Sequence, residues 1–223
     1  MHRPAENNSP ATLQEQDNSQ RLYKIALRLA MFTIIYNIIE GLVATFFGYK
    51  DESLTLFGFG VDSFIEAVSG FGIAHMVLRI RNHPESSRDS FEKTALRITG
   101  ISFYLLTTGL AVGSVRDFLG NHKPETTIAG VIISAISILV MIWLFYNKMR
   151  VGKKLCSDAV IADAGCTKVC IYMSLILLAS SAVYEFTGIA YADIIGSLGI
   201  AYFSFKEGRE CFQKVKQDKY CEC

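Results

Sequence analysis

Two pairs of side chains in the sequence combine metal-binding chemistry with helical spacing. Asp62 and Glu66 are four residues apart, and so are Cys166 and Cys170. In a helix, side chains at this spacing lie on the same face, one turn apart. Two carboxylates so close together repel each other away from water, unless a cation lies between them or one of them keeps its proton. Two oxygens and two sulfurs would complete a four-coordinate site, the geometry that zinc prefers.

Each pair also has a simpler interpretation. The carboxylates can form hydrogen bonds to neighbouring helices, and free cysteines often pack as small apolar side chains. Cys166 and Cys170 could instead cycle between dithiol and disulfide, although helical residues four apart lie near the largest Cα separation that a disulfide bridges. The two pairs lie at similar depths in the helices predicted below, and this shared depth favours a common metal site.

These side chains are predicted to lie in membrane-spanning helices. The chain has 223 residues, of which 51% are hydrophobic, and its mean hydropathy is +0.30. A spanning helix needs about 20 mainly apolar residues. Six such stretches occur, near residues 25–47, 53–78, 94–118, 127–147, 158–183 and 187–205. We therefore predict an all-α membrane protein in which a bundle of six transmembrane helices occupies residues 21–208.

The distribution of basic residues predicts how the bundle is oriented. Lys and Arg are concentrated before the first predicted span, in the second and fourth loops, and after the sixth span. The opposite side has only Lys50, Arg116 and Lys123. Because loops rich in Lys and Arg stay in the cytoplasm, both termini are predicted to be cytoplasmic. The expected location is the cell membrane, where lipid surrounds the bundle. The net charge of +1 gives no support to nucleic-acid binding.

The two ends of the sequence are predicted to be tails. Residues 1–20 are polar, lack the apolar core of a signal peptide and are predicted to be a disordered cytoplasmic tail. Residues 209–223 are predicted to form a short cytoplasmic tail that contains Cys211, Cys221 and Cys223. A Cys-x-Cys sequence can bind a soft cation, so this tail is either a first contact for the metal or an ordinary solvated segment.

Further polar side chains lie inside the predicted spans, where a charge costs roughly 2.5 to 3.5 kcal/mol. Asn37 and Glu40 lie in the first span, and Asp163 and Lys168 lie in the fifth. Lys168 is predicted either to pair with Asp163 or Glu40, or to balance the charge of the metal site. Four anionic ligands around one divalent ion leave an excess of negative charge, so metal binding is expected to be coupled to proton binding.

The sequence resembles the transmembrane part of the cation diffusion facilitator family over about residues 20–210. Members carry an H/D-x-x-x-D pair in the second span, which Asp62 and Glu66 match. A second such pair in the fifth span corresponds to Cys166 and Cys170, which follow Asp163 as in the family. Two further segments, residues 37–41 and 191–197, resemble polar patches of the family's first and sixth spans.

The resemblance implies a transporter of divalent metal ions and not an enzyme. It implies proton-coupled efflux from the cytoplasm, with Asp62, Glu66, Cys166 and Cys170 as the metal ligands and with no cofactor besides the transported ion. Thiolates stand where the family has His or Asp, and they favour softer ions. Zinc is therefore the expected cargo, with cadmium or another thiophilic ion as the alternative.

The partners that follow are lipid, metal ions and protons. Family members continue past the sixth span into a cytoplasmic domain that supports dimerisation, whereas this sequence ends soon after that span, so a homodimer is left open. Two other functions also stay open. One is a membrane thiol oxidoreductase that uses Cys166 and Cys170, and the other is a metal receptor that binds the ion without transporting it.

Overall fold

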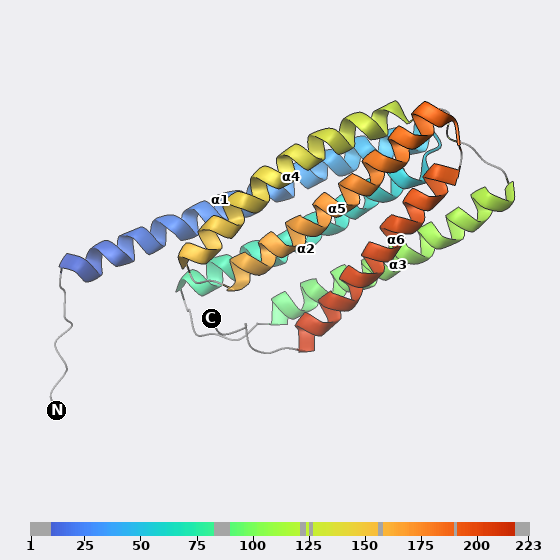
Figure 1. The fold of residues 1–223 in the computed structure, drawn as a ribbon. Coiled ribbons are helices and arrows are strands. Elements are labelled where there is room, and N and C mark those ends of the chain that lie inside the picture. Colours follow the sequence, from blue (N-terminus) through green and yellow to red (C-terminus); the bar gives the residue numbers. More distant parts are fainter. Residues whose placement is uncertain are drawn as a thin grey trace.

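The computed structural model describes residues 10–82, 90–120, 124, 127–155, 158–189 and 191–216, and the structural statements below refer to these residues. They form six helices that run up and down along one long axis (Figure 1). The helices are α1 Pro10–Lys50, α2 Leu54–Asn82, α3 Ser90–Gly120, α4 Ile128–Leu155, α5 Asp158–Thr187 and α6 Tyr191–Lys216. The predicted all-α fold is confirmed.

Five of the helices are long and apolar enough to cross a membrane. The qualifying segments are Gln20–Lys50, Leu54–Arg79, Leu96–Gly120, Ile128–Leu155 and Asp163–Thr187. The sixth predicted span, 187–205, corresponds to α6, which is not among them. That helix carries Asp193 in its first turn and several charged residues from Lys206 onward, which shorten its apolar stretch.

The helix ends differ from the predicted boundaries. α1 begins at Pro10, within the segment predicted to be a disordered tail, and α6 continues to Lys216, into the predicted C-terminal tail. Residues 1–9 and 217–223, including Cys221 and Cys223, lie outside the described residues. The hydropathy pattern does not detect these extensions because they are polar, although they are helical.

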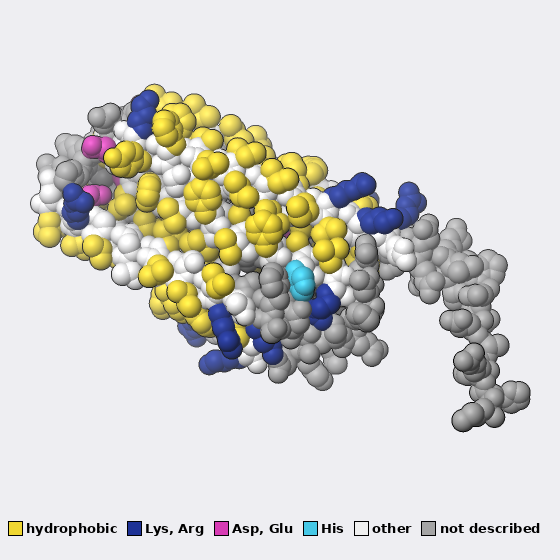
Figure 2. Space-filling model, turned by 180° about the vertical axis from the view of Figure 1, so that it is seen from behind, with side chains coloured by type: hydrophobic (Ala, Val, Ile, Leu, Met, Phe, Trp, Pro, Cys, Tyr) yellow, Lys and Arg dark blue, Asp and Glu magenta, His cyan; other side chains and the backbone are white. Residues whose placement is uncertain are grey.

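The outer surface of the bundle is predominantly apolar. Large side chains such as Leu105, Leu139 and Ile195 each expose more than two thirds of their area, at 69%, 71% and 69%. Figure 2 shows hydrophobic side chains over the long face, with Lys and Arg gathered toward its ends. A surface of this kind is stable against lipid hydrocarbon, since helices satisfy their own backbone hydrogen bonds.

The helices associate mainly in three pairs, α1 with α2, α4 with α5, and α3 with α6. Glycine allows the first pair to pack closely: a Cβ atom at Gly60 of α2 would lie 2.5 Å from the backbone nitrogen of Thr45 in α1. α2 also packs on α5 and α6, so it is the central helix of the bundle. Side chains of α2 therefore meet those of α1, α5 and α6.

Apolar side chains hold these pairs together in two core clusters. One lies among α2, α3, α5 and α6 and includes Leu56, Phe59, Leu110, Leu177 and Ile200. The other lies among α1, α2, α4 and α5 and includes Ala26, Val77, Leu144, Val160 and Cys170. Because Cys170 belongs to the second cluster, its thiol is held among packed side chains.

At the end of the bundle where α2 and α6 begin, one carboxylate joins the two helices. The Oδ1 atom of Asp193 accepts a hydrogen bond from Ser53 Oγ at 2.7 Å, and its Oδ2 atom accepts one from the backbone N–H of Leu54 at 2.9 Å. Thr55 Oγ1 in turn donates to the backbone oxygen of Asp193 at 2.5 Å. Asp193 thus caps α2 from another helix and satisfies an amide that has no partner within α2.

Candidate metal centre

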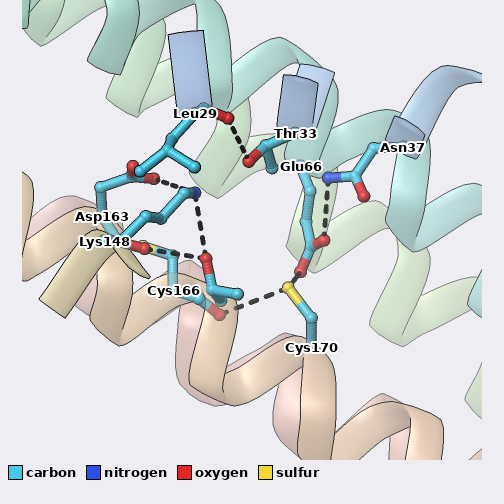
Figure 3. Close-up of polar contacts among 9 residues, drawn as sticks. Leu29, Thr33, Asn37, Glu66, Lys148, Asp163, Cys166 and Cys170 are labelled. Carbon is cyan, nitrogen blue, oxygen red and sulfur yellow. Dashed lines mark hydrogen bonds and ion pairs between the residues drawn. The ribbon is translucent and has the colours of Figure 1, made fainter. Parts of the chain in front are cut away.

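The closest contact between two predicted ligands joins α2 to α5. The thiol of Cys170 donates to Oε1 of Glu66, and the Sγ and Oε1 atoms are 2.5 Å apart (Figure 3). Cys170 is buried, and its Sγ atom also lies 3.3 Å from the backbone oxygen of Cys166, one turn earlier on α5. A carboxylate oxygen and a thiol sulfur from two helices, both of them predicted ligand atoms, therefore meet at one point in the bundle.

The other oxygen of Glu66 is bound by α1. Asn37 donates from Nδ2 to Oε2 of Glu66 at 3.2 Å (Figure 3). Asn37 is only 1% exposed, and its Oδ1 atom has no hydrogen-bond partner. Glu66 is thus held between Asn37 on one side and Cys170 on the other. Three helices contribute to this arrangement, α1, α2 and α5.

Asp62 lies one turn from Glu66 toward the start of α2. It is 1% exposed, and its Oδ1 atom has no hydrogen-bond partner. The charges of Glu66, Glu207 and Glu40 act on its carboxylate. A buried carboxylate oxygen without a donor is costly to keep, because it has lost water and gained nothing in return.

Cys166 is half-buried and lies apart from the contact between Glu66 and Cys170. Figure 3 shows its side chain on the side of Lys148 and Asp163. Among the described residues, no three His, Cys, Asp or Glu side chains converge closely enough to hold one metal ion. The structure therefore brings Glu66 and Cys170 together, while Asp62 and Cys166 lie nearby without completing a site.

The pairing of Lys168 with Asp163, one of the predicted alternatives, is wrong. The carboxylate of Asp163 binds Nζ of Lys148 from α4 at 2.9 Å, and the same Nζ lies 3.1 Å from Oγ1 of Thr167 (Figure 3). Lys168 is exposed instead, and its Nζ atom lies 5.7 Å from the centre of the Tyr172 ring. Lys148 lies one residue beyond the fourth predicted span, 127–147, but α4 continues to Leu155 and holds its side chain inside the bundle.

Glu40 does not pair with Lys168 either. Its Oε1 atom accepts a hydrogen bond from Tyr36 at 2.9 Å, and its Oε2 atom accepts one from Ser63 at 3.1 Å. The side chain is only 6% exposed. Hydroxyl groups of α1 and α2 therefore solvate this carboxylate in place of a lysine.

A family comparison identifies the class of protein. The family model described as the cation efflux transmembrane domain matches residues 30–217. The chain belongs to the cation efflux family. Two curated relatives are the uncharacterized transporter MJ0449 of Methanocaldococcus jannaschii, 25% identical over 175 residues, and the manganese efflux system protein MneP of Bacillus subtilis, 27% identical over 201 residues.

The alignments cover 77% and 84% of this chain but 62% and 66% of the two relatives, so the chain spans less than two thirds of either length. Membership of the cation efflux family confirms the family resemblance predicted from the sequence. Together with the five apolar helices, it makes the chain a multi-pass membrane protein of a transporter family, not of an enzyme family.

The cation efflux bundle has one acidic side chain that sequence reasoning missed. Glu207 of α6 is only 7% exposed, and its charge acts on both Asp62 and Glu66. The sequence predicted residue 207 to lie beyond the sixth span. Ser204, Glu207 and Cys211 are three and four residues apart, so they share one helix face, and the structure buries all three.

Proposed function

We propose that this protein carries a divalent transition-metal ion across the membrane and that Asp62, Glu66, Cys166 and Cys170 bind the ion in transit. The observation that carries the proposal is the contact between Glu66 and Cys170 beside the unpartnered oxygen of Asp62. A thiol and two carboxylates from two helices would then face one buried position. Zinc sites use this combination of ligand types.

The charge balance around this position supports a cation. Lys148 is the one buried Lys or Arg among the side chains that the structure describes, and it binds Asp163. The carboxylate of Asp62 is also buried, and that of Glu66 is half-buried. Carboxylates inside a membrane bundle need protons or cations, because lipid and apolar side chains do not solvate them.

Metal binding requires a small rearrangement. A tetrahedral ion with bonds of about 2.0–2.3 Å keeps its ligand atoms about 3.5 Å apart. The 2.5 Å between Cys170 Sγ and Glu66 Oε1 would therefore widen, and the side chains of Asp62 and Cys166 would turn toward the ion. The thiol proton of Cys170 would leave as the metal binds, which couples transport to protons.

The ligand set leads us to propose zinc or cadmium as the preferred cargo. Thiolates favour soft ions, whereas carboxylates also accept harder ions such as manganese. One relative is named a manganese efflux protein, so manganese is the competing cargo that a test must include. We further propose efflux from the cytoplasm in exchange for protons, with both termini on the cytoplasmic side.

Two observations weigh against the alternative of a thiol oxidoreductase. Neither Cys166 nor Cys170 forms a disulfide in the structure, and the thiol of Cys170 is directed at Glu66 instead of the thiol of Cys166. A disulfide would require the helical backbone to adjust as well. The receptor alternative predicts binding without transport, so it is separated from the proposal by measuring flux.

The proposal is tested in proteoliposomes with an imposed pH gradient and an enclosed metal-sensitive dye. We expect gradient-dependent flux of zinc or cadmium that is lost in Asp62→Ala and in Cys170→Ser. Cys211→Ser is the matched control, because Cys211 is a buried cysteine of α6 outside the proposed ligand set. Metal binding without flux would support the receptor, and flux that survives Asp62→Ala would refute the proposed site.

A further inference from the structure

We propose that Asn37 is a fifth ligand of the metal site, through its side-chain Oδ1 atom, and that it shifts the site's preference toward harder ions such as manganese. This inference rests on the proposed metal site and adds a helix to it. The sequence places Asn37 in the first predicted span. The structure places its side chain directly against Glu66.

The amide oxygen of Asn37 lacks a hydrogen-bond partner. An asparagine amide has two N–H donors and one oxygen acceptor. Nδ2 donates to Oε2 of Glu66, whereas Oδ1 has no hydrogen-bond partner although the residue is only 1% exposed. A buried amide oxygen normally accepts a hydrogen bond. This oxygen therefore has a free lone pair next to a proposed metal ligand.

Asp62 also has a buried oxygen without a hydrogen-bond partner. Among the side chains that the structure describes, Asn37 Oδ1 and Asp62 Oδ1 are the two carbonyl or carboxylate oxygens that are buried without a partner. Both residues neighbour Glu66, one through a hydrogen bond and the other through one helical turn and its charge. A cation placed among Asn37, Asp62 and Glu66 would satisfy the Oδ1 atoms of Asn37 and Asp62. Neither of these atoms accepts a hydrogen bond in the structure.

Neighbouring donors are already committed to other acceptors. The hydroxyl of Thr33 donates to the backbone oxygen of Leu29 on its own helix at 2.9 Å. The hydroxyl of Tyr36 donates to Glu40, and the thiol of Cys170 donates to Glu66. None of these three donors therefore satisfies Asn37 Oδ1, which stays available to an incoming ion.

An amide ligand changes which ion the site prefers. It adds a hard oxygen without adding charge, so the excess of negative charge around the ion does not grow. Together with Asp62, Glu66 and the two cysteines, it raises the number of ligands from four to five. Zinc is satisfied by four ligands, whereas manganese favours more ligands and oxygen in preference to sulfur. Asn37 would thus broaden a thiol-containing site toward manganese.

The test measures manganese and cadmium binding by calorimetry on the purified full chain and on Asn37→Ala and Asn37→Asp. We expect Asn37→Ala to weaken manganese binding about tenfold and cadmium binding far less. Asn37→Asp keeps an oxygen and should retain manganese binding. Thr33→Ala is the matched control, since Thr33 lies one turn away on α1 and bonds only its own helix in Figure 3; its affinities should not change.

Two results would overturn the inference. An equal loss of manganese and cadmium binding in both Asn37 variants would show that Asn37 only orients Glu66 through Nδ2. Unchanged affinities in both variants would show that its oxygen does not contact the ion. Failure of the proposed metal site is a separate result, because the unsubstituted chain would then bind neither metal.

Discussion

The Sγ atom of Cys170 lies 2.5 Å from Oε1 of Glu66, although 104 residues separate the two in the sequence. Glu66 belongs to α2, which pairs with α1, and Cys170 belongs to α5, which pairs with α4. The contact therefore bridges two helix pairs. Relative movement of these pairs would change the distance between the two atoms directly, as transport by alternating access requires.

Metal binding should protect specific cysteines from alkylation. Cys170 is 6% exposed and Cys166 is half-buried, so Cys166 should react faster with a maleimide in the metal-free protein. Saturating cadmium should then slow the labelling of both residues, while Cys211, 5% exposed and outside the ligand set, keeps its own rate. Mass spectrometry of the labelled peptides measures each rate. Protection of Cys170 alone would remove Cys166 from the ligand set.

Replacing both thiols with carboxylates should shift the metal preference of the site toward harder ions. In the double variant Cys166→Asp with Cys170→Asp, all ligands are oxygens, as manganese prefers. We expect the ratio of manganese to cadmium affinity to rise by about tenfold or more relative to the unsubstituted protein. Competition for a metal-binding dye measures the ratio. An unchanged ratio would mean that the cysteines do not contact the ion.

Acidification should weaken metal binding, because the ion must displace the thiol proton that Cys170 shares with Glu66. The affinity should rise with pH, and each bound ion should release at least one proton. Calorimetry in buffers of different ionisation enthalpy counts the protons released. Cys170→Ser should release fewer protons than the unsubstituted protein, and equal release by the two would assign the proton to another group.

Lys148 should be important for stability, whereas Lys168 should not. Lys148→Met would leave Asp163 buried without its cation, and breaking such a pair destabilises a protein by about 3–5 kcal/mol. Lys168→Met, the matched control at an exposed position of α5, should change stability by less than about 0.5 kcal/mol. Unfolding in detergent measures both effects.

The double variant Lys148→Met with Asp163→Leu separates charge from packing. Removing both charges leaves no buried ion, so much of the lost stability should return. If the double variant is as unstable as Lys148→Met alone, the loss comes from packing of the lysine stem and not from the stranded carboxylate.

The sequence alone predicted the helices well, because a membrane bundle is built from apolar stretches. Each of the six helices overlaps one of the six stretches expected near residues 25–47 to 187–205. The starts and ends were less predictable. The helix from Pro10 to residue 20 is polar and separate from the apolar core, so hydropathy gives no signal for it.

The candidate site was only partly predictable. Spacing within one helix identified Asp62 with Glu66 and Cys166 with Cys170, since residues four apart share a face. Contacts between helices depend on how the helices rotate and pack, which one sequence does not contain. The sequence therefore did not reveal that Asn37 meets Glu66 or that Lys148, instead of Lys168, reaches Asp163.

The hydrogen bonds of the Asp193 carboxylate bear on the rate of transport. Asp193 joins the first turns of α2 and α6 through Ser53, Leu54 and Thr55, at the end of the bundle proposed to face outward. If the ion leaves at this end, these hydrogen bonds must loosen in every cycle, and they would set how long the ion dwells inside. Weaker hydrogen bonds at Asp193 would then give faster transport in a less stable protein, the compromise between activity and stability that many proteins show.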